Sequence, residues 1–157
     1  MAKTAVVTDS TAYIPEELCK ELNITVVPLA VIWGDESYLD GVTMKPADFY
    51  ARLQDSKVMP STSQATPEGM KKAFSNALDQ GMDVMGVFIS EKLSGTLDSA
   101  RQAREELASA KDKIAIFDSE TGLWSYRRVA YDIPDVQSRM RKAGLPERHI
   151  MRLEIGW

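Results

Sequence analysis

Apolar positions along the chain fall into two alternating patterns. Short runs rich in β-branched residues predict strands at 4–8, 24–33, 36–39, 84–89 and 114–117. Longer stretches with apolar residues three and four positions apart predict helices at 15–22, 46–53, 67–80 and 97–110. Because strands alternate with helices, we expect an α/β fold whose mainly parallel sheet carries helices on both faces.

Prolines, glycines and hydroxyl residues mark the ends of these elements. Pro15 suits the first position of a helix, and Thr66 suits the N-cap of the helix that starts at Pro67. Gly81 is placed to end that helix. Pro28 interrupts the run 24–33 and predicts an edge strand or a bulge there.

Polar side chains gather where the predicted strands end. Asp9-Ser10-Thr11 follows the first strand, 90–96 follows the strand at 84–89, and Asp118-Ser119 follows the last. In parallel sheets, ligands bind beyond the carboxyl ends of the strands. The sequence therefore predicts a hydroxyl-rich site at this edge, which the polar loop 60–64 can join.

Charge divides the chain near residue 120. The 157 residues carry a net charge of −4, which gives no basic footprint for nucleic acid. Residues 1–120 hold 12 Lys and Arg against 19 Asp and Glu, whereas 121–157 hold 7 against 4. We expect an α/β domain over 1–120 and a basic tail over 121–157, with a short helix at 136–143 and a short strand at 150–155.

The numbers of cysteines and histidines, and the length of the apolar runs, limit the expected compartment and metal sites. The sequence has one cysteine, Cys19, so no intramolecular disulfide is expected, and with one histidine an ordinary zinc site is not expected either. The first strand begins at Thr4, which leaves no room for a leader. Apolar runs are too short for a membrane span. A cytoplasmic protein is the simplest expectation.

Enzymatic readings of the strand-end residues find little support. Ser94 does not lie in a G-x-S-x-G elbow, and the sole histidine available as a base is His149 in the tail. Asp9, Asp40 and Asp118 can in principle hold magnesium, but aspartates after strands more often cap turns. We expect no metal and no catalytic residue.

The start of the helix at 97–110 suits an anion. A loop that feeds a helix presents free N–H groups, and Ser94 and Thr96 add hydroxyls. No phosphate-binding glycine pattern is present, and Lys92 is the only nearby base. A singly charged carboxylate therefore fits better than a phosphate. Two plainer alternatives stay open: Ser94 as a helix N-cap, and Thr62 as a loop hydroxyl bonded to its own backbone.

A set of short motifs in fixed order resembles the N-terminal domain of the DegV family of bacterial fatty-acid-binding proteins. The motifs are Thr8-Asp9-Ser10-Thr11-Ala12, Val26-Val27-Pro28-Leu29, Asp40-Gly41, Pro60-Ser61-Thr62-Ser63-Gln64, Leu93-Ser94-Gly95-Thr96 and Asp118-Ser119. Each is short, but six in register over residues 1–120 form a specific match.

The resemblance implies a site and a role. In the family, one fatty acid lies between two α/β domains and is presented to a fatty acid kinase, so the protein is a carrier and not an enzyme. The matching carboxylate-binding positions are Thr62 and Ser94, with the backbone of Gly95 nearby. Secondary candidates are Ser63, Thr96 and Ser10. The implied ligand is a long-chain fatty acid, with no other cofactor.

The sequence also departs from the family. It is about half the expected length, so the second domain is expected to be missing or truncated. Arg127, Arg128 or His149 are candidates to replace polar contacts from that domain. Two alternatives remain: a fragment without ligand, acting as a structural domain that dimerises through an exposed apolar face, and a phosphate-binding α/β enzyme domain.

Overall fold

The computed structural model describes residues 3–120, 137–138 and 141–142. The chain divides into two compact units, and residues 3–120 belong to the unit Lys3–Val129. Of the tail helix expected at 136–143, residues 137–138 and 141–142 are described and are helical, and the others lie outside the described residues. The tail strand, Arg127, Arg128 and His149 lie outside them entirely. No helix in the described ranges has the length and apolar composition needed to cross a bilayer.

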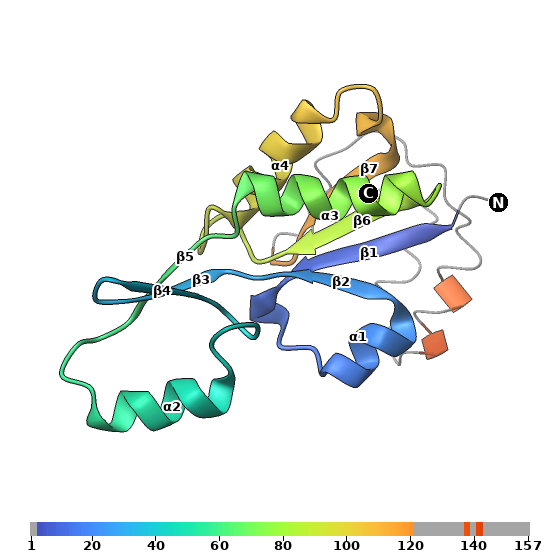
Figure 1. The fold of residues 1–157 in the computed structure, drawn as a ribbon. Helices are drawn as coiled ribbons and strands as arrows, with labels where there is room; N and C mark the ends of the chain where they lie inside the picture. Colours follow the sequence, from blue (N-terminus) through green and yellow to red (C-terminus); the bar gives the residue numbers. More distant parts are fainter. Residues whose placement is uncertain (1–2, 121–136, 139–140, 143–157) are drawn as a thin grey trace. The chain divides into compact units, whose positions relative to one another are not determined.

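A four-stranded parallel sheet forms the centre of the unit (Figure 1). Its order is β2 (Ile24–Val27), β1 (Thr4–Asp9), β6 (Asp83–Phe88) and β7 (Ile114–Asp118). The chain moves from β1 to β2 in one direction and from β1 to β6 and β7 in the other. Because such crossovers are right-handed, the two directions place their helices on opposite faces.

Three helices cover this sheet, as expected from the sequence. Helices α3 (Pro67–Asp79) and α4 (Thr96–Glu106) pack on one face, and α1 (Glu16–Leu22) lies beside β2 on the other (Figure 1). Burial alternates along β6, where every second residue is buried, whereas β7 is buried at four of its five positions. The main core consists of buried strand residues and their helix partners, including Val7, Phe74, Val84, Phe88, Leu97, Ile114 and Ile116.

Gly86 lies in this core because the site has no room for a side chain. A Cβ there would meet Cε2 of Phe88 at 2.5 Å and Cζ at 3.0 Å. Phe88 is 1% exposed, so its ring has little space to move. We expect Gly86→Ala to lower the free energy of unfolding by about 1–3 kcal/mol, the usual cost of overpacking. Urea denaturation measures this, with Asn76→Ala on the exposed face of α3 as the control. Equal midpoints for G86A and wild type would contradict it.

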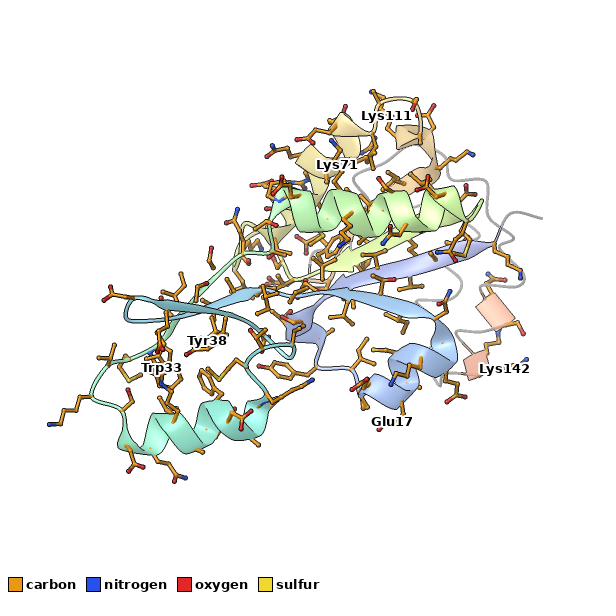
Figure 2. The ribbon with its side chains drawn as sticks, viewed as in Figure 1. Glu17, Trp33, Tyr38, Lys71, Lys111 and Lys142 are labelled. Carbon is orange, nitrogen blue, oxygen red and sulfur yellow. The ribbon has the colours of Figure 1, made fainter. Side chains whose placement is uncertain are left out.

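Within the same unit, a smaller antiparallel subdomain lies beside the main sheet. Its antiparallel sheet has the order β4 (Glu36–Leu39), β3 (Ala30–Trp33), β5 (Ser61–Ser63), and α2 (Pro46–Asp55) packs against it. Val31, Trp33 and Met44 form its buried core, with Phe49 and Leu53 of α2 alongside. Figure 2 shows Trp33 and Tyr38 between this sheet and α2.

Arg52 of α2 covers that small core. Its guanidinium lies 4.6 Å from the centre of the Trp33 ring and donates to the Tyr38 hydroxyl at 2.9 Å. It also pairs with Glu36, and this hydrogen bond lowers the pKa of the Glu36 carboxyl. The long side chain therefore shields the apolar cluster while its charge remains paired.

Two sequence predictions were wrong. The run 24–33 is not one strand: it divides at Pro28 into β2 and β3, which belong to different sheets. Proline supplies no N–H for strand pairing, and the N–H of the next residue, Leu29, donates to Ser10 Oγ at 3.1 Å. The loop 60–64 contains β5, which pairs with β3 through Thr62 and Val31. A three-residue polar strand has no hydrophobic pattern by which to find it.

The predicted signals at the two ends of α3 were confirmed, whereas Pro15, expected at the first helical position, is the N-cap of α1. Thr66 Oγ1 accepts from Gly69 N at 3.1 Å at the start of α3, and Gly81 follows that helix with φ +73°. Strands β3 and β4 form a hairpin whose turn includes Gly34, where φ is +63°. The helix expected to reach residue 110 ends at Glu106 instead, and a short 3-10 turn, Lys111–Lys113, leads into β7.

Candidate functional site

The order of the parallel strands creates a topological switch point at one edge of the sheet. From β1 the chain crosses to β2 on one side and reaches β6 on the other. The loops after β1 and β6 therefore leave neighbouring strands in opposite directions, and such a switch point is where open α/β sheets bind ligands. Here the loop after β6, residues 89–95, leads directly into α4.

Two buried carboxylates hold this loop from the neighbouring strands. Asp9 at the end of β1 accepts from Ile89 N at 2.8 Å, and Asp118 at the end of β7 accepts from Glu91 N at 3.1 Å. Asp9 also accepts from Thr11 N at 2.9 Å, and Asp118 from Glu120 N at 2.9 Å. The expectation that these two aspartates cap turns is confirmed. Among the described residues, no group of three or more acidic, His or Cys side chains is placed to hold a metal ion.

Ser94 lies at the end of the loop, immediately before α4. Its Oγ accepts from Thr96 N at 3.2 Å and lies 3.0 Å from Thr96 Oγ1. This bond closes a local serine turn just before the helix, whereas the N-cap of α4 is Gly95, so Ser94 is not itself the N-cap. The N–H of Gly95 has no acceptor within the described part of the chain. A helix start with a free N–H and an adjoining hydroxyl can bind an anion.

Thr62 occupies the middle of β5, an edge strand of the small sheet. It pairs with Val31, so its side chain shares a face with Val31 and not with Ser61 or Ser63. Thr62 is exposed, and across the described ranges its hydroxyl forms no hydrogen bond. The alternative in which this hydroxyl bonds its own backbone is therefore not what the structure shows.

Three contacts join the end of β5 to the start of α4. Ala65 N donates to Thr96 Oγ1, and Gln64 Nε2 donates to Ser99 Oγ, both at 3.3 Å. A Cβ on Gly95 would lie 2.3 Å from Gln64 Oε1, so the glycine allows the amide to approach the loop backbone. Thr62 is three residues from Ala65, within about 10 Å along the chain. The structure thus brings the Thr62 and Ser94 segments to one place.

The secondary candidates differ in where their hydroxyls lie. Ser63 is exposed, next to Thr62. Ser10 is 8% exposed and accepts from Leu29 N, and Thr96 has no exposed surface. The hydroxyls of Ser10 and Thr96 therefore fasten loops together inside the domain. The sequence did not point to Gln64 as a contact of Gly95, because nothing local relates the two positions.

Positive charge near the loop is largely paired. Arg101 lies 2.7 Å from Glu91 and 2.9 Å from Asp98. Lys92, in the loop before α4, is exposed. Binding a multiply charged phosphate usually requires several Lys or Arg side chains aimed at one point. The arrangement of the described residues suits a singly charged ligand better.

These features define a domain of the parallel α/β class with hydroxyl and N–H donors at a helix start. The chain belongs to the DegV family, whose family model, described as "Uncharacterised protein, DegV family", matches residues 3–136. The resemblance found in the sequence is confirmed. The match extends beyond residue 120, where the sequence placed a domain boundary, and that boundary stays a prediction.

Named relatives support the family assignment. A DegV domain-containing protein of Listeria monocytogenes is 38% identical over 119 residues, which are 75% of this chain and 41% of the relative. One of Caldanaerobacter subterraneus is 40% identical over 119 residues, covering 76% of this chain and 41% of the relative. The chain thus matches about two fifths of the length of these relatives.

Solved structures show the same fold. A stearic-acid-binding protein from Eubacterium ventriosum gives a TM-score of 0.73 at 26% identity, covering 98% of this chain and 52% of that protein. DegV of Bacillus subtilis, described as a fatty-acid-binding protein, gives 0.69 at 29% identity, covering 98% and 53%. The chain therefore corresponds to about half of each solved protein.

Proposed function

We propose that this chain binds a long-chain fatty acid and that Thr62 and Ser94 hold its carboxylate. The observation that carries the proposal is the join between β5 and α4. Gln64 and Ala65 contact the helix start that carries Ser94 and the free N–H of Gly95, and Thr62, whose exposed hydroxyl is unpaired among the described residues, lies two and three residues before them. The fatty-acid-binding neighbours support the choice of ligand.

The proposed division of labour follows from the chemistry of a fatty acid. The carboxylate is a singly charged acceptor, which hydroxyl and N–H donors satisfy with charge-assisted hydrogen bonds. The acyl chain supplies most of the affinity, at about 0.8 kcal/mol for each methylene removed from water. The proposed role is that of a carrier without catalysis, which presents the acid to a fatty acid kinase.

Removing either hydroxyl is expected to weaken binding about tenfold to hundredfold. A hydrogen bond to a charged group is worth about 1.5–3 kcal/mol, which corresponds to that range of Kd. The variants are Ser94→Ala and Thr62→Val, and Kd for palmitic acid is measured by displacement of a fluorescent fatty acid. Ser61→Ala is the matched control, because Ser61 lies on the same strand as Thr62 but on its other face.

Native mass spectrometry of the full chain, purified from bacteria and then supplied with palmitic acid, tests the function itself. Retention of one acid per chain supports it. If no acid is retained and the protein self-associates, the alternative of a structural domain without ligand holds. If acid is retained equally by wild type, S94A and T62V, the function stands and the site assignment fails.

A further inference from the structure

Three hydrogen bonds form a continuous chain from β5 to the loop before α4. Ala65 N donates to Thr96 Oγ1 at 3.3 Å, and Thr96 Oγ1 lies 3.0 Å from Ser94 Oγ. Ser94 Oγ also accepts from Thr96 N at 3.2 Å. The middle hydroxyl, on Thr96, is fully buried, whereas Ser94 is half-buried at the domain surface.

The direction of the central bond follows from counting donors. A hydroxyl donates one proton and accepts two. If Ser94 donated to Thr96, the Thr96 proton would have no acceptor among the described residues and would be buried, which is costly. If Thr96 donates to Ser94, the hydroxyl and the N–H of Thr96 fill both acceptor positions of Ser94 Oγ. The proton of Ser94, which is half-buried, then needs no partner within the domain. The second arrangement satisfies every group.

We propose that Thr96 is a positioning residue that fixes Ser94 as a pure donor, with its O–H directed out of the domain. Thr96 has no exposed surface, so it acts through Ser94 and does not touch the ligand. Linked hydroxyls polarise one another, which strengthens the last donor in the chain. This inference rests on the proposed function, because the group that accepts the Ser94 proton is the fatty-acid carboxylate.

The arrangement has a consequence for ligand selectivity. A donor-only Ser94, with the free N–H of Gly95 beside it, matches a headgroup that accepts hydrogen bonds and carries negative charge. A fatty alcohol of equal length buries the same methylenes but offers a neutral oxygen. The ratio of Kd for the alcohol to Kd for the acid therefore reports the orientation of Ser94, while the acyl chain cancels.

The same threonine also sets how β5 meets α4. Its acceptor bond goes to Ala65, three residues after Thr62, and Gln64 reaches Ser99 alongside. Loss of the Thr96 hydroxyl therefore affects both the orientation of Ser94 and the join to the Thr62 strand. The two effects separate in the double variant with Ser94→Ala, in which only the join remains to be lost.

The test compares palmitic acid with hexadecan-1-ol in the full chain carrying Thr96→Val, Thr96→Ser or no change. We expect T96V to lower the alcohol-to-acid Kd ratio about tenfold, the equivalent of one weakened charge-assisted hydrogen bond. T96S keeps the hydroxyl and is expected to stay near the wild-type ratio. Thr66→Ala, which removes the cap of α3, is the control that lowers the melting temperature without changing the ratio.

The double variant decides whether Thr96 acts through Ser94. In a Ser94→Ala background, T96V is expected to lower the ratio clearly less than it does in the wild-type background, because only the join to the Thr62 strand remains to be lost. An equal fall in the ratio with and without Ser94 would overturn the inference, as would a wild-type ratio in T96V. In either of those cases wild type still binds palmitic acid and the proposed function stands. If wild type binds neither ligand, the proposed function fails and this inference fails with it.

Discussion

Replacing Trp33 by alanine is expected to lower the free energy of unfolding of the antiparallel subdomain (β3, β4, β5 and α2) by about 3–5 kcal/mol. This is the usual cost of removing a buried aromatic ring. Trp33 is 3% exposed, packs edge-on against Phe49 with ring centres 5.3 Å apart, and donates to Ser56 Oγ at 2.9 Å. Only three residues of the described chain form that buried cluster, so little else can replace the ring.

The effect of Trp33→Ala is expected to reach the ligand site through β3. Thr62 pairs with Val31 of β3, so loss of the small core releases the strand that carries Thr62. Amide hydrogen exchange should rise in β3, β5 and α2 and stay slow in β1, β6 and β7, whose core is separate. Trp33→Phe keeps an aromatic ring but loses the hydrogen bond to Ser56. Its free energy of unfolding is expected to lie between those of Trp33→Ala and the wild type. Uniform loss of protection in all strands would contradict the expectation that the antiparallel subdomain unfolds separately from the parallel sheet.

Replacing Asp9 by alanine is expected to cost about 3 kcal/mol of unfolding free energy and to loosen the loop before α4. Asp9 is completely buried, and its carboxylate accepts from Ile89 N, Thr11 N and Thr11 Oγ1. Each hydrogen bond to a charged group contributes about 1.5–3 kcal/mol, and the N–H groups left behind are themselves buried or partly so. Chemical denaturation measures the loss of stability.

Two comparisons make the Asp9 result specific. Asp79→Ala removes an exposed carboxylate at the end of α3 and is expected to change stability by less than about 0.5 kcal/mol. Asp9→Asn keeps one acceptor oxygen, so its free energy of unfolding is expected to lie between those of Asp9→Ala and the wild type. Faster exchange of the Ile89 amide in D9A would show that this carboxylate holds the loop. An unchanged Ile89 amide would rule out that role.

The carboxylate-binding proposal draws on both sequence and structure in unequal parts. The Leu93-Ser94-Gly95-Thr96 motif placed a hydroxyl and an N–H at a helix start, which is a local property of strand, loop and helix order. The structure added what surrounds them. Gln64 against Gly95, and Ala65 on Thr96, are contacts between segments 31 residues apart, and no local pattern encodes them.

The sequence by itself determined the elements whose signals are local. The hydrophobic period identified the strands of the parallel sheet, and Thr66 and Gly81 marked the ends of α3, because caps depend on residues within one turn. The family motifs were likewise recognised from their order along residues 1–120.

Only the tertiary structure decided how the segments pair and which hydroxyls remain free. The run 24–33 divides between two sheets, and the polar residues 61–63 become a strand, because strand pairing is decided by a distant partner and not by the strand's own pattern. Thr62, Ser94 and Thr96 are chemically similar in sequence. Burial and the bond to Ala65 make Thr96 internal, while Thr62 is left exposed and Ser94 half-buried.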